Sequence, residues 1–179
     1  MKDIAKATMK QILYKFMINL FSYNNDEYYT YFNNPSNTND GKLLLSGTNT
    51  YAGTTSITTG VIQIANNNAL GAAGSTNTIV GSGAALEING TSTALTIPEA
   101  ITINGTGLSG GGAIRLVTGA LAATLTGTIT VATASRINSD SGTLTLNKST
   151  TAITGTNVNL TIGGSGDTTV STIISTGSG

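Results

Sequence analysis

The sequence predicts an all-β protein in which short strands stack as the successive coils of a β-solenoid. From Gly41 onward, aliphatic residues alternate with polar ones, and the short runs are separated by Gly, Asn, Ser and Asp. No stretch with helical periodicity intervenes, which excludes the crossover helices of an α/β fold. Residues 41–179 contain a single aromatic residue, Tyr51. A narrow stacked interior therefore fits better than a β-sandwich, which usually buries aromatic side chains.

Nine pairs of aliphatic residues define the expected strands, because each pair brackets one residue that would point the other way. The pairs are Leu43/Leu45, Ile62/Ile64, Leu86/Ile88, Leu95/Ile97, Ile101/Ile103, Ile114/Leu116, Ile129/Val131, Leu144/Leu146 and Leu160/Ile162. Most bracketed residues are polar, among them Gln63, Glu87 and Arg115. One face of each strand is thus expected to be buried and the other to meet water.

Similar segments recur along the chain, as stacked units require. "EINGT" at 87–91 returns as "TINGTG" at 102–107, and "SGTLTL" at 141–146 echoes "DGKLLLSG" at 40–47. Coils of roughly 20 residues would give about seven coils and a rod near 30 Å long. Asn89 and Asn104 are expected to form hydrogen bonds along such a stack.

Residues 1–40 differ from the rest, since they hold all three Phe, all three Met and five of the six Tyr. Apolar residues at spacings of three and four predict an amphipathic helix over residues 5–22, and Pro35 with the polar run at 33–40 predicts a linker. The helix is too short to span a membrane. It either covers one end of the solenoid, acts as a degenerate secretion signal, or is foreign to the domain. We therefore divide the chain into 1–40 and 41–179.

Composition excludes several classes of function. Charged residues make up 9% of the chain, eight basic and eight acidic, so no basic patch is expected to attract nucleic acid or a membrane surface. The chain has no Cys and no His. Disulfides, thiol catalysis, zinc sites with Cys or His ligands, and triads with an imidazole base are excluded.

Two glycine-rich motifs resemble ligand sites without their context. "GTGLSG" at 105–110 fits the dinucleotide fingerprint, but "GGAIRLVTG" follows it in place of a helix, so turn glycines explain it better. "GGSGD" at 163–167 resembles a calcium-binding nonapeptide, but Asp167 comes one residue early and no second copy exists. Neither a cofactor nor a metal is expected.

An enzyme of the carbohydrate-active type would need two carboxylates about 5 to 10 Å apart. Glu87 and Glu99 are the candidates for such a pair on adjacent coils. Asp140 in "NSDSG" and Glu99 after Pro98 lie in turn-like sequences, which favours solvated structural roles. No catalytic residue is expected. The acids of residues 41–179 are Glu87, Glu99, Asp140 and Asp167, and the cations are Lys42, Arg115, Arg136 and Lys148.

The segment "GKLLLSGTNTYAGTTSITTGVIQIANNNALG" at 41–71 resembles the passenger-associated transport repeat, also called the autotransporter-associated β-strand repeat. The segments downstream are similar to the inter-repeat regions of the same passengers. Residues on the repeat pattern, all with expected structural roles, are Gly41, Leu43, Leu45, Gly47, Asn49, Thr50, Tyr51, Gly53, Thr55, Ile57, Gly60, Ile62 and Ile64. Tyr51 falls in a turn of the pattern, where its ring is expected to pack over the coil.

The resemblance implies a right-handed parallel β-helix that is exported to the surface of a Gram-negative bacterium. It also implies further repeats and an outer-membrane barrel in the full-length protein. The function expected first is a stalk or spacer whose progressive folding aids its own export. The alternatives are an adhesin module that binds host glycans or matrix protein and, with less support, a carbohydrate-active β-helix enzyme.

Overall fold

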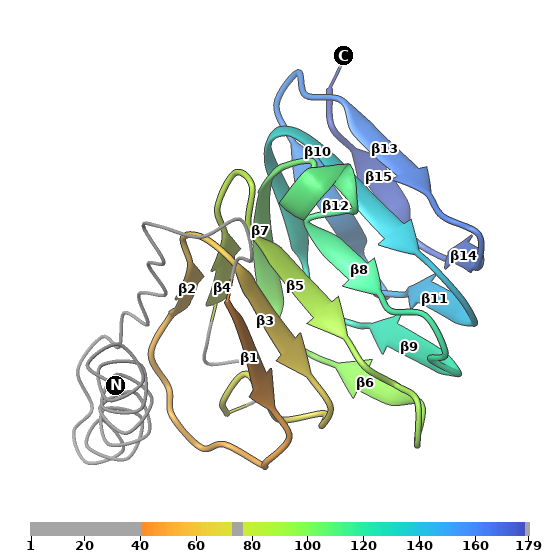
Figure 1. Cartoon of the computed structure of the whole chain (residues 1–179). Helices are drawn as coiled ribbons and strands as arrows, with labels where there is room; N and C mark the ends of the chain where they lie inside the picture. The colour runs from red at the N-terminus through yellow and green to blue at the C-terminus, as the bar shows by residue number, and fades with distance from the viewer. Residues whose placement is uncertain (1–40, 73–76, 178–179) are drawn as a thin grey trace.

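The computed structural model describes residues 41–72 and 77–177, and this part of the chain forms a parallel β-solenoid (Figure 1). All pairings between its named strands are parallel, from Lys42 opposite Val61 to Ile153 opposite Ile174. A sandwich of antiparallel layers is therefore excluded, and the expected fold class is confirmed. The expected helix at 5–22 and linker at 33–40 lie outside the described residues.

The coils have three flat faces, which give the solenoid a triangular course (Figure 1). The first face consists of β1 (Lys42–Leu45), β3 (Val61–Ile64), β5 (Ala85–Ile88), β8 (Ile114–Leu116), the second half of β10 (Ile129–Ser139), and β13 (Leu160–Gly163). The second face consists of β2 (Thr55–Ile57), β4 (Asn77–Val80), β7 (Ala100–Gly105), the first half of β10, β12 (Thr151–Gly155), and β15 (Ile173–Ser175). The third face consists of β6 (Leu95–Ile97), β9 (Ala122–Leu125), β11 (Thr143–Leu146), and β14 (Asp167–Val170).

Strand β10 joins two of these faces, because its two halves pair with different strands. Ile129 lies opposite Ile101 of β7, whereas Ile137 lies opposite Ile114 of β8. The register shifts between Val131 and Ser135, where the strand bends from one face to the other. The first and second faces are thus parts of one continuous sheet.

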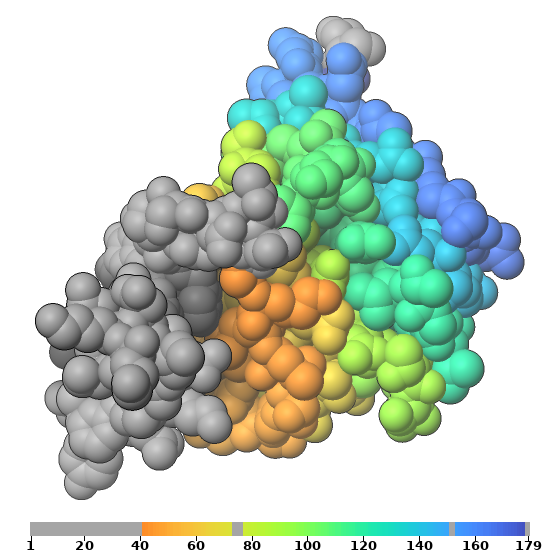
Figure 2. All heavy atoms as spheres, viewed as in Figure 1, coloured from red at the N-terminus to blue at the C-terminus, as the bar shows by residue number. Residues whose placement is uncertain are grey.

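Most coils of this solenoid are longer than the expected 20 residues. On the first face, Leu43, Ile62, Leu86, Ile114, Ile137 and Ile162 are successive register partners, separated by 19, 24, 28, 23 and 25 residues. The longest step contains the loop with the 3-10 helix η2 (Leu108–Gly110). The solenoid therefore has about five coils rather than seven, and at about 4.8 Å per coil it is roughly 24 Å long. Figure 2 shows the coils as successive bands of colour.

The core is one column of aliphatic side chains that runs through the coils. All nine expected pairs lie in strands. Ile62, Leu86, Ile114 and Ile137 are stacked in register and fully buried. Burial of each such side chain contributes about 1.5 to 3 kcal/mol. Because each coil buries its aliphatic residues on the next, the stack is stabilised along its axis.

Asparagine side chains also tie adjacent coils together, but not as a ladder of like residues. The amide of Asn89 donates to Oε1 of Gln63 at 3.3 Å, and that of Asn104 donates to the carbonyl of Val80 at 3.1 Å. The expected bonds between coils exist, while their acceptors are a glutamine and the backbone.

The motif at 105–110 is a turn, as its sequence context indicated. It begins at the last residue of β7 and contains η2, and Gly105, Gly107 and Gly110 all have φ between 72° and 81°. A Cβ on Gly107 would lie 2.0 Å from the carbonyl oxygen of Gly112. These glycines are required by backbone geometry.

Candidate functional site

Residues of the repeat motif build the first coil and the start of the second. Leu43 and Leu45 lie in β1, Thr55 and Ile57 in β2, and Ile62 and Ile64 in β3, while Gly41, Gly47, Asn49, Thr50, Tyr51, Gly53 and Gly60 lie between or before these strands. Gly60 has φ +75°, and a Cβ there would lie 2.6 Å from the carbonyl oxygen of Gly41. This contact explains why glycine is needed where the second coil begins.

Tyr51 packs over the solenoid, as expected for the motif. A Cβ on Gly71 would lie 3.0 Å from two atoms of the Tyr51 ring, so the ring lies directly against this glycine. The Tyr51 hydroxyl and Oγ1 of Thr55 are 2.7 Å apart. Burial raises the pKa of Tyr51 above 10.0, although the hydrogen bond with Thr55 opposes this rise.

Five of the eight charged residues that follow Gly41 gather on the outer side of the first face. Strand alternation turns Gln63, Glu87, Arg115 and Asn138 outward, and parallel pairing places them in register on four successive strands. Neighbouring side chains in such a column are only about one strand spacing apart, roughly 4.8 Å. The parallel stack therefore brings together residues that are far apart in the sequence.

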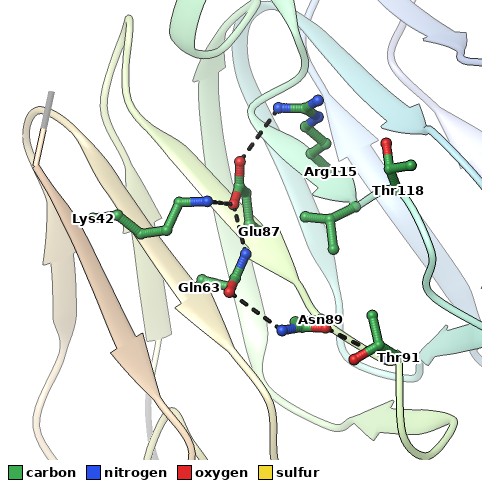
Figure 3. A pocket seen from close by; sticks show the side chains of 8 residues that line it. Lys42, Gln63, Glu87, Asn89, Thr91, Arg115 and Thr118 are labelled. Carbon is green, nitrogen blue, oxygen red and sulfur yellow. Dashed lines mark hydrogen bonds and ion pairs between the residues drawn. The ribbon is translucent and has the colours of Figure 1, made fainter. Parts of the chain in front are cut away.

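Two carboxylates and two cations alternate along this face, and Figure 3 shows three of them, Lys42, Glu87 and Arg115. Nζ of Lys42 lies 2.6 Å from Oε2 of Glu87, and Nη1 of Arg115 lies 3.3 Å from Oε1 of the same carboxylate. On its other side, Arg115 contacts Oδ2 of Asp140 through Nη2 at 2.5 Å and through Nε at 2.6 Å. Arg115 thus bridges Glu87 and Asp140.

Amide side chains extend these ion pairs into a longer chain of hydrogen bonds. Gln63 donates to Oε2 of Glu87 at 2.8 Å, and Asn138 donates to Oδ1 of Asp140 at 2.6 Å. Arg136 donates to Oδ1 of Asn138 through Nε at 3.1 Å and Nη2 at 2.7 Å. We call the set the first-face network: Lys42, Gln63, Glu87, Asn89, Arg115, Arg136, Asn138 and Asp140.

The network is anchored by the nearly buried carboxylate of Glu87. Glu87 is 5% exposed, and its two oxygens receive Lys42, Gln63 and Arg115. Exposed ion pairs contribute only about 0 to 1 kcal/mol each, but removal of a partner from a buried charge costs about 3 to 5 kcal/mol. The network therefore acts as a clamp across the coils, with Glu87 at its centre.

A shallow hollow of about 330 Å³ lies over part of this network (Figure 3). Its lining is polar apart from Val117, and no aromatic ring contributes to it. The residues around it are Lys42, Gln63, Glu87, Asn89, Thr91, Arg115, Val117 and Thr118. The hollow presents amide and hydroxyl groups, while both oxygens of Glu87 already have partners.

The four acids considered for catalysis do not form one site. Glu87 and Asp140 share Arg115, whereas Asp167 is exposed at the start of β14 on the third face. Glu87 and Glu99 belong to the same coil but to different faces, so they do not form the candidate pair on adjacent coils. The reason is the length of this coil, in which a whole face separates them.

Glu99 does lie at a corner, between β6 and β7, but it is not solvated. It is 1% exposed, which corrects the expectation of a solvated role. In the described residues, no group of three or more acidic side chains is arranged to hold a metal ion. Within the same residues, no helix is long and apolar enough to cross a membrane.

The first-face network was not predicted from the sequence. The alternation correctly predicted that Gln63, Glu87 and Arg115 point outward, but it did not indicate which of them are neighbours. Their contacts depend on steps of 24 and 28 residues between register partners. A search for outward charges of opposite sign at such spacings would have found the pair of Glu87 and Arg115.

Comparisons with known proteins found no match for this chain. No family model matches the chain, and no curated protein or solved structure matches it. The resemblance to the passenger-associated transport repeat thus depends on the motif residues themselves, and membership of that family stays a prediction.

Proposed function

We propose that the chain is a structural stalk or spacer segment of a surface-displayed passenger. The observation that carries the proposal is the continuous aliphatic column, with Ile62, Leu86, Ile114 and Ile137 stacked in successive coils. A stack of this kind transmits its shape along one axis and needs no ligand to hold it together. Its exposed positions are mainly Thr, Ser and Gly, with few charges.

The first-face network supports the same role. It joins the first coil at Lys42 to the fifth coil at Arg136 through ion pairs and hydrogen bonds. Lys42 and Arg115 neutralise its two carboxylates, so these charges pair with one another within the rod. A general acid or base in this network would first have to lose Arg115 or Lys42. We therefore do not assign an enzymatic activity.

The stacked arrangement also suits an export route through the outer membrane of a Gram-negative bacterium. Each emerging coil can bury its aliphatic residues on the coil before it, so folding outside the cell would favour outward movement. In this proposal the motif residues 41–64 begin one such unit, and further repeats and a barrel follow in the full-length protein.

The proposal is tested by locating the protein on intact cells of its own host. Protease added to the outside of intact cells should digest the wild-type protein. A passenger with Leu86→Asp, which places a charge in the column, should be displayed poorly, while Thr96→Asp on an exposed position of β6 should be displayed normally. Protection of the wild-type protein from surface protease would contradict the proposal.

An adhesin is the second candidate, and the hollow on the first face is the observation that favours it. Gln63, Asn89, Thr91 and Thr118 surround the hollow with groups that can bond to sugar hydroxyls. It lacks an aromatic ring on which a sugar could stack. A glycan array and matrix-protein binding assay, each with Asn89→Ala as control, would separate the two functions, since silence favours the spacer.

A further inference from the structure

The corner between β6 and β7 contains an acid that the first-face network does not use. Glu99 is 1% exposed, and neither of its carboxylate oxygens has a side-chain partner among the described residues. A buried carboxylate without a cation or side-chain hydrogen-bond donors is disfavoured in its charged form. The protonation state of Glu99 therefore determines whether its burial is tolerated.

Polar groups of the first two coils lie at the same end of the interior as Glu99. Tyr51 is close enough for the charge of Glu99 to contribute to the raised pKa of the phenol, after the larger effect of burial. Thr55, which bonds to the Tyr51 hydroxyl, lies opposite Thr78 in the next coil. Oγ1 of Thr78 is also buried without a partner. We call this set of four residues the polar corner: Tyr51, Thr55, Thr78 and Glu99.

No cation in the described residues neutralises this corner. Tyr51 is the titratable group of the corner whose pKa responds to the charge of Glu99, and the threonines are neutral. On the coils that follow, Gly127 lies against the backbone of Glu99, since a Cβ there would be 1.8 Å from the Glu99 carbonyl oxygen. Lys148 donates to Oγ1 of Thr128, and no ion pair between described residues involves Glu99.

We propose that Glu99 is a buried proton-binding site, which is neutral in the folded solenoid and loosens the polar corner when it loses its proton. The proton removes the cost of a charge in an environment that offers it no counter-ion. Burial raises the pKa of Glu99 from 4.5, while its own backbone N–H lowers it by a smaller amount. The first coils of the solenoid are consequently most stable in mildly acidic surroundings, where Glu99 keeps its proton.

The sign of the pH effect follows from linkage. Below about 4.5 the carboxyl is protonated in both the folded and unfolded chain, so this group makes no difference. As the pH rises, the unfolded chain releases the proton first, because only the folded state has the raised pKa. Stability is therefore lost as the pH rises through the folded-state pKa of Glu99.

Carbon-13 NMR of the glutamate side-chain carboxyls measures the proton directly. The chain contains three glutamates, Glu27, Glu87 and Glu99, so three signals are expected, and Glu99→Gln identifies the one that matters. We expect the Glu99 signal to keep the chemical shift of a neutral acid above the pH at which a model peptide ionises, about 4.3. Ionisation of Glu99 at or below that pH would overturn the proposal.

Unfolding experiments on the wild type and Glu99→Gln give an independent test. The two proteins should unfold alike in acid, and the variant should become the more stable one as the pH rises. A difference that does not change with pH would contradict the proposal. So would stabilisation of the wild type at neutral pH by added K⁺ or Ca²⁺ that Glu99→Gln lacks, because a cation would then occupy the corner.

Discussion

Arg115 and Asp140, 25 residues apart in the sequence, are joined by two contacts to one carboxylate oxygen, at 2.5 and 2.6 Å. The pair exists because β8 and β10 lie side by side in the parallel stack, with Arg115 opposite Asn138. The same guanidinium also contacts Glu87, on the strand before it. One side chain thus connects three coils.

Arg115→Ala should therefore destabilise the solenoid by about 2 to 4 kcal/mol, because Glu87 and Asp140 lose a shared cation and Glu87 is nearly buried. Arg115→Lys should cost less, since it keeps the charge without the two-sided geometry. Denaturant unfolding measures both. Arg136→Ala is the matched control, as Arg136 reaches only the amide oxygen of Asn138 within the network. Equal effects of Arg115→Ala and Arg136→Ala would show that the bridge is unimportant.

Gly60→Ala should destabilise more than Gly83→Ala, although both residues have similar positive φ values, 75° and 80°. A Cβ on Gly83 meets no atom within 4 Å, so only the backbone cost of about 1 to 2 kcal/mol applies. At Gly60 the new carbon would lie 2.6 Å from the Gly41 carbonyl oxygen, and the strands must separate. Thermal unfolding of the two variants compares them. Identical losses would mean that the contact of Gly41 and Gly60 is not formed.

Thr78→Val should stabilise the protein by about 1 kcal/mol, because it removes a buried hydroxyl that has no partner and keeps the side-chain shape. Thr55→Val is the contrasting change, since it breaks the 2.7 Å hydrogen bond to Tyr51 and should destabilise by about 1 kcal/mol. Chemical unfolding at constant pH measures both. If Thr78→Val weakens the fold, a hydrogen-bond partner for its hydroxyl must exist.

Tyr51→Ala should lower the stability by about 3 kcal/mol, because the ring lies against Gly71 and covers the start of the solenoid. Tyr51→Phe keeps the ring and loses only the bond to Thr55, so about 1 kcal/mol is expected. The two midpoints of thermal unfolding separate packing from hydrogen bonding. Unchanged unfolding of Tyr51→Ala would refute a packing role.

The aliphatic alternation was sufficient to predict the fold class and nine of the strands, but it missed others. Strands β2, β4 and β14 carry Thr55, Thr78 and Thr168 at inward positions, where the pattern requires an aliphatic residue. A β-branched threonine fills the same space as valine, so it fits the interior. Because threonine is polar, however, it interrupts the alternation of aliphatic residues by which a strand is recognised in the sequence. Strand β9 has the small Ala123 at its inward position and was missed for a similar reason.

The candidate site was less predictable than the strands, because it depends on the length of each coil. Loops such as the one that contains η2 change this length without changing the alternation. Glu87 therefore meets Arg115 rather than Glu99, and Glu99 is enclosed at a corner that the sequence suggested would be solvated. Short-range patterns determine which side chains point inward, whereas contacts between coils depend on every loop before them.

Methyl NOEs between the stacked side chains test the central column most directly. In a specifically methyl-labelled sample, cross-peaks should link Ile62 with Leu86 and Leu86 with Ile114, across 24 and 28 residues of sequence. Absence of these cross-peaks, together with contacts of antiparallel neighbours such as β5 against β6, would contradict a solenoid of stacked coils.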